Sequence, residues 1–124
     1  MALLTKSKFM NGLQCPRLLW YANKKLMPEL SLFDKHKFSQ GHAFEVVVHQ
    51  LFPDGIKLEE SDFKGNIDQT KELIAQRKTI FEAGIMAGEY YVRCDVLRPC
   101  DDGSWDLIEI KSSSEVKDVH FPDL

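Results

Sequence analysis

The chain has 124 residues, enough for one domain with a modest hydrophobic core, and its 44% apolar and 28% charged residues are ordinary for a soluble globular protein. No apolar run approaches the roughly 18 residues that cross a bilayer, and the N-terminus lacks a signal-peptide pattern, so we expect a cytoplasmic protein with no membrane partner. The net charge of −3 argues weakly against a nucleic-acid partner.

The first 37 residues form a basic segment with two predicted short helices. They hold seven basic and two acidic residues, whereas the rest of the chain holds nine basic and 17 acidic ones. Helices are expected over 5–13, capped by Thr5 or Ser7, and over 16–23. A basic segment beside an acidic body suits phosphate contact by one part and cation binding by the other, although a solvated basic surface fits the charge equally well. The candidate DNA contacts are Lys6, Lys8, Arg17, Lys24 and Lys25.

A longer helix is expected next. Residues 26–33 contain a proline and predict an irregular connection. Asp34 is a candidate cap for a helix over 34–52, and the sequence Pro-Asp-Gly at 53–55 predicts its end.

The second half of the chain predicts most of a sheet. A short strand near 56–58 precedes a helix that opens at Asn66 or Asp68 and ends near Gln76. Three strands are then expected, with a turn at 101–103 before the last, over 79–86, 89–98 and 104–111. This order predicts an α/β or α+β fold with a mixed sheet flanked by helices, as one domain over 1–124.

The candidate catalytic residues lie on the last two predicted strands. Alternation places Glu109 and Lys111 on one face of the strand 104–111, and a hairpin can bring Asp95 beside Glu109. Paired carboxylates favour a hard cation such as Mg²⁺, and a neighbouring lysine can orient water and stabilise charge on a phosphate. The alternative is an ordinary surface ion pair, which is common for Glu-x-Lys on a strand.

Four segments resemble a known family in their order along the chain: LTKSKFMNGLQCPRLLWY, GHAFEVVVHQLFPDGI, CDVLRP and WDLIEIKSSSEVKDVHFPDL. They resemble RecB-like nucleases of the PD-(D/E)xK superfamily, including the exonucleases of CRISPR adaptation, and above all a RecB-like group of bacterial proteins. The resemblance implies a restriction-endonuclease-like core that hydrolyses DNA with Mg²⁺ or Mn²⁺. It also implies that Asp95, Glu109 and the backbone carbonyl of Ile110 bind the metal while Lys111 assists the attacking water.

The same resemblance implies a further metal ligand on the helix that follows Gly41. Glu45 is the best match, with His42 in reserve, and His49 lies on the same helical stripe. The alternative is an ordinary surface pair between Glu45 and His49. Glu82, in the first of the three strands, is expected to face solvent.

The cysteines and the C-terminal residues depart from the family pattern. Cys15 resembles the first iron–sulfur cysteine of some relatives, but a cluster needs about four thiolates, so it is expected only if a longer parent supplies the rest. Buried apolar roles are expected for Cys15, Cys94 and Cys100.

The family's Gln and Tyr helix would begin near Leu124. We therefore expect either a piece of a longer protein, with further domains or a homo-oligomer as partners, or a shortened product. In both cases we expect these 124 residues to cleave DNA weakly or not at all. The alternative function is a catalytically incomplete nuclease-fold module that binds nucleic acid or a protein.

Overall fold

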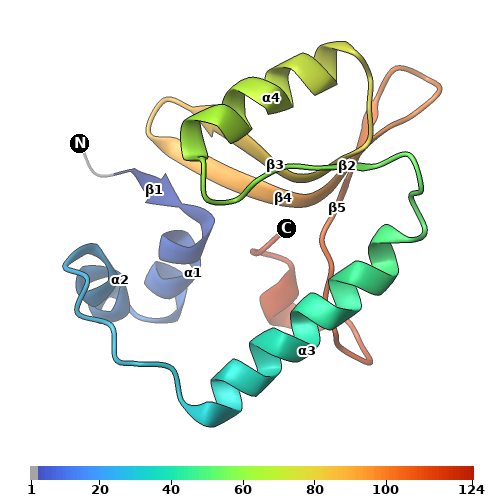
Figure 1. Cartoon of the computed structure of the whole chain (residues 1–124). Coiled ribbons are helices and arrows are strands. Elements are labelled where there is room, and N and C mark those ends of the chain that lie inside the picture. Colours follow the sequence, from blue (N-terminus) through green and yellow to red (C-terminus); the bar gives the residue numbers. More distant parts are fainter. Residues whose placement is uncertain (1–2) are drawn as a thin grey trace.

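The computed structural model describes residues 3–124 and has a mixed α+β fold, a curled mixed sheet flanked by helices (Figure 1). The helices are α1 (Lys6–Gln14), α2 (Pro16–Asn23), α3 (Leu32–His49), α4 (Phe63–Ala75) and a 3-10 turn, η1 (Asp118–His120). The strands are β1 (Leu4–Thr5), β2 (Ile56–Lys57), β3 (Ile80–Ala87), β4 (Tyr90–Pro99) and β5 (Trp105–Ile108). The predicted α+β class is confirmed.

An antiparallel hairpin of β3 and β4 forms the centre of the sheet. The short β2 runs parallel to β3 on its outer edge. On the other edge of β4, β1 pairs with Tyr90 and Tyr91, while β5 pairs with the strand from Val96 to Pro99. Lys6, which follows β1, and Glu109, which follows β5, meet at 2.6 Å between these two partners of β4.

The two faces of the sheet have different neighbours. Helix α4 lies along one face, and α1, α3 and the C-terminal residues lie on the other side (Figure 1). The buried core is on the α4 side, where Leu73 and Ile74 of the helix pack against a cluster of sheet residues: Leu58, Ile80, Ala83, Cys94 and Leu97. On the other side, Phe81 stacks on His49 of α3 with ring centroids 3.9 Å apart.

Two predicted helix starts were wrong, for the same reason. Ser31 rather than Asp34 caps α3, because its hydroxyl accepts the amide hydrogen of Asp34 at 3.1 Å. Helix α4 begins after Asp62, whose carboxylate accepts the amide of Gly65 at 3.0 Å. In each case a cap-forming residue lay further upstream than the one chosen.

Two predicted element ends were also too late. Helix α3 ends at His49, not at Phe52, because a residue before proline disfavours helical backbone and Phe52 precedes Pro53. Strand β5 ends at Ile108, so Glu109 and Lys111 lie beyond it rather than within a strand that reaches 111. The carboxylate of Asp95 accepts the amide hydrogen of Ile110 at 2.7 Å and takes the place of a main-chain partner.

Among residues 3–124, no helix combines the length and the apolar character that crossing a membrane requires. Helix α3, the longest, instead exposes several large apolar side chains, including Phe33, Phe38, Val46 and Val47.

Candidate metal centre

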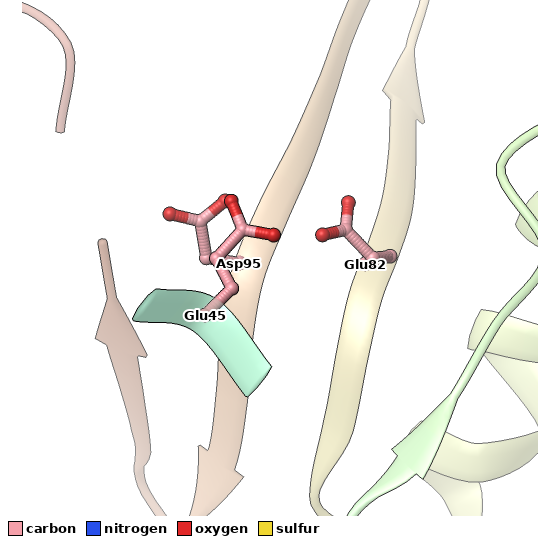
Figure 2. A group of neighbouring side chains, drawn as sticks. All are labelled: Glu45, Glu82 and Asp95. Atoms are coloured by element: carbon pink, nitrogen blue, oxygen red, sulfur yellow. The ribbon is translucent and has the colours of Figure 1, made fainter. Parts of the chain in front are cut away.

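Three carboxylates from three elements converge on the α3 side of the sheet (Figure 2). Glu45 comes from α3, Glu82 from β3 and Asp95 from β4, and each offers an oxygen that lies within 4.8 Å of the other two. The register of the β3–β4 hairpin brings two of these carboxylates together. The pairs Phe81–Val96 and Ala83–Cys94 lie on either side of Glu82 and Asp95, so these two residues stand opposite each other. Carboxylate oxygens in this number and spacing suit a hard divalent cation.

Glu82 reaches this position through an unusual backbone conformation. Its φ is +60°, which is the left-handed region that non-glycine residues seldom adopt within a strand. The strand alternation breaks there: Ile80 and Ala83 both pack toward α4, whereas Phe81 and Glu82 both face α3. Backbone strain of this kind persists only where the surroundings hold it, and it gathers at functional sites.

A buried amide on α4 holds the strained strand. Asn66 donates hydrogen bonds to the carbonyls of Glu59 and Glu82, at 3.0 and 2.9 Å, and accepts the amide hydrogen of Gly84 at 2.8 Å. Thr70, also buried, accepts from the same Gly84 amide at 3.1 Å. Position 84 must be glycine for this approach, because a Cβ there would lie 2.3 Å from the amide oxygen of Asn66. The polar face of α4 therefore fixes the conformation that turns Glu82 toward α3.

The burial of Glu82 is electrostatically costly. Only 4% of the residue is exposed, and burial raises the pKa of its carboxyl from 4.5 to about 7. Arg93 opposes this shift with an ion pair to Glu82 at 2.7 Å, while Glu60, Asp95 and Glu45 add to it. A bound cation would compensate the negative charge that these carboxylates share.

Glu109 and Lys111 lie in a cleft beside this cluster, which Asp95 and Arg93 also line. The Glu109 carboxylate contacts Lys111 at 3.0 Å and Lys6 at 2.6 Å. It is therefore occupied by ammonium groups, and within residues 3–124 the group of acids spaced for a metal is completed by Glu82 instead.

The structure places the other predicted ligands as follows. His42 is exposed and its Nδ1 lies 3.5 Å from Glu45. His49 turns inward onto Phe81, burial lowers its pKa, and its Nε2 is buried without a hydrogen-bond partner among residues 3–124. Ile110 contacts Asp95 through its amide, whereas its carbonyl had been expected to bind the metal.

The predicted DNA-binding residues fall into two groups. Arg17, Lys24 and Lys25 are exposed at α2 and just after it. Lys8 is half-buried and donates to the carbonyl of Leu3 at 3.0 Å, and Lys6 turns toward Glu109.

The three cysteines are free thiols. Cys94 is buried in the core, where burial raises its pKa to about 11, and Cys15 and Cys100 are half-buried.

The sequence interpretation missed Glu82 and Asp123. Glu82 was expected to face solvent, and that was wrong because the alternation breaks at this residue. The available signal was a lone acid inside the apolar run Ile-Phe-Glu-Ala-Gly-Ile. Asp123 contacts both Lys6 and Lys111 from beyond the predicted elements, and no pattern in the sequence pointed to it.

Comparisons with protein families, with characterised proteins and with solved structures gave no match for this chain.

Proposed function

We propose that this chain is a metal-dependent deoxyribonuclease domain with a restriction-endonuclease-like core, of the RecB-like branch of the PD-(D/E)xK superfamily. The observation that supports it most directly is the convergence of Glu45, Glu82 and Asp95 beside a cleft that contains Lys111. A scaffold without a ligand has no evident reason to bury Glu82 in a strained strand next to two other acids.

In this proposal each residue has one task. Glu45, Glu82 and Asp95 hold a Mg²⁺ or Mn²⁺ ion, which acidifies bound water and offsets charge on the phosphate. The ammonium group of Lys111 donates hydrogen bonds to the attacking water and to the phosphate oxygens. Glu109 keeps Lys111 in the cleft through the contact at 3.0 Å. The exposed Arg17, Lys24 and Lys25 contact the DNA backbone.

Cleavage of labelled single-stranded and double-stranded DNA in Mn²⁺ tests the proposal. It predicts weak cleavage that a chelator stops and that Asp95→Asn abolishes. Metal-independent cleavage, or cleavage that Asp95→Asn leaves unchanged, would contradict it.

A second candidate function is a nucleic-acid-binding module without turnover. The observation that favours it is the engagement of Lys111 by two carboxylates, Glu109 and Asp123, which compete with a substrate for the ammonium group. DNA that binds in Mn²⁺ and remains intact at long incubation times would support this alternative over the first.

A further inference from the structure

Lys6 and Lys111 share two carboxylates in a closed arrangement. Lys6 contacts Glu109 Oε2 at 2.6 Å and Asp123 Oδ1 at 3.3 Å. Lys111 contacts the opposite oxygens, Glu109 Oε1 at 3.0 Å and Asp123 Oδ2. Each carboxylate therefore spans both ammonium groups with its two oxygens, and the two positive charges are balanced by two negative ones.

The two carboxylates are attached to the fold in different ways. Glu109 follows β5 directly, and its neighbour Ile110 is fixed by the hydrogen bond to Asp95. Asp123 follows the short turn η1, which an exposed and irregular stretch, 112–117, joins to the rest of the chain. Asp123 is therefore attached outside the sheet through an exposed segment, whereas Glu109 is anchored at the end of a sheet strand.

The position of Asp123 marks a site for an anion. Its carboxylate is 14% exposed and lies in the same cleft as Asp95, beside the three-carboxylate cluster. Two oxygens of a phosphate group have the same bridging geometry as two oxygens of a carboxylate, and ammonium groups bind both. The hydrogen bonds that Lys111 donates to Asp123 and Glu109 outweigh its burial and raise its pKa, so the lysine stays charged.

We propose that Lys6 and Lys111 form a phosphate subsite for the DNA backbone, and that the Asp123 carboxylate occupies this subsite until DNA displaces it. This inference rests on the proposed function and adds to it a second lysine, from α1, and a removable internal competitor. Lys6 binds the substrate in this proposal, because it holds the phosphate while Lys111 also faces the water.

The test of this inference is the binding of a labelled 12-nucleotide single-stranded DNA, measured by fluorescence anisotropy in the presence of a chelator. This measurement requires neither bound metal nor DNA cleavage. The matched variants are Asp123→Asn and Asp118→Asn, because both remove one negative charge from the same segment and Asp118 is exposed. Asp123→Asn should tighten binding about fivefold more than Asp118→Asn does, a modest gain because partly exposed ion pairs are weak.

Further substitutions in the Asp123→Asn protein assign the gain to Lys6. Lys6→Gln should remove the gain and Lys6→Arg should restore most of it, and circular dichroism checks that each variant is folded. Equal affinities of Asp123→Asn and Asp118→Asn, or a gain that survives Lys6→Gln, would overturn the subsite. Failure of the proposed nuclease function would appear separately, as absence of Mn²⁺-dependent cleavage with this binding pattern intact.

Discussion

The two halves of the candidate site compensate charge in opposite ways. In the cluster of Glu45, Glu82 and Asp95, a single arginine, Arg93, pairs with one of three carboxylates. In the neighbouring half, two lysines and two carboxylates balance each other. The first half holds more carboxylates than cationic partners, an excess of negative charge that suits a cation from solvent. The second half balances its charges within the chain, and in our proposal an anion from solvent replaces one of the two carboxylates.

The halves also differ in how the chain holds them. Glu82 is buried and strained, and the side chains of α4 fix its backbone from the far face of the sheet. The lysine half is built from residues at or beyond the ends of β1, β5 and η1. A rigid half suits the geometry that a metal demands, and an adjustable half suits the entry and exit of a polymer.

The largest expected effect concerns the lysine half. Lys111→Ala should reduce the rate of DNA cleavage by about 10²–10³, equivalent to roughly 3–4 kcal/mol, because a preorganised donor acts in the chemical step. Mn²⁺ binding should be retained, since Lys111 is not a ligand. Lys71→Ala is the control, because Lys71 is exposed on α4. Single-turnover cleavage that is equally fast in Lys111→Ala and Lys71→Ala would refute the role.

The next effect concerns the support of the acidic half. Asn66→Ala should lower the free energy of unfolding by about 2–3 kcal/mol, because two carbonyls and the Gly84 amide lose a buried partner. Asn23→Ala, at the exposed end of α2, should change it by less than about 0.5 kcal/mol. Urea denaturation measures both. Similar values for the two variants would mean that Asn66 does not hold the strained strand.

A pH experiment sharpens the comparison further. The folded-state pKa of Glu82, about 7, lies above its ordinary 4.5, so the folded state binds the proton more tightly than the unfolded chain. The stability that this provides is fully present below pH 4.5 and is lost as the pH rises through 7. Without metal, Glu82→Gln should reduce this decline by roughly 2–3 kcal/mol.

Unfolding free energies measured between pH 5 and 8 in a chelator show this difference. A parallel pH dependence of stability in the unsubstituted protein and in Glu82→Gln would contradict the assignment of this decline to Glu82. In the unsubstituted protein, added Mn²⁺ should restore stability most at high pH, because the metal requires the ionised carboxylate.

The sequence predicted much of this fold because the helices and the long strands are signalled locally. Pro16 and the apolar residues of α2, and the turn before β5, are examples. The site was harder to predict from the sequence, because it depends on the left-handed backbone conformation of Glu82 and on contacts between residues far apart in the chain. Simple alternation along β4 would place Leu97 on the face of Asp95, yet Leu97 lies in the core on the α4 side. The break at Glu82 is held by contacts of Gly84 with Asn66 and Thr70, and the acid inside an apolar run was the one local signal of it.

The smallest expected effect separates two neighbours on α3. Glu45→Gln should weaken Mn²⁺ binding at least about tenfold, because it removes one of three carboxylates. His42→Ala should change the affinity by less than about twofold, because the imidazole is exposed and lies 3.5 Å from Glu45. Calorimetric titration compares them. If His42→Ala has the larger effect, the histidine is the ligand and Glu45 only orients it.

Calorimetric titration of Mn²⁺ into the parent and into Asp95→Asn tests the central claim most directly, namely that Glu45, Glu82 and Asp95 together hold a divalent ion. The matched control is Asp68→Asn, an exposed carboxylate on α4 with the same change of charge. We expect one Mn²⁺ site in the unsubstituted protein. Its affinity should be unchanged in Asp68→Asn and weakened about tenfold to 100-fold in Asp95→Asn. Equal Mn²⁺ affinity in all three proteins would show that these carboxylates do not form a metal site.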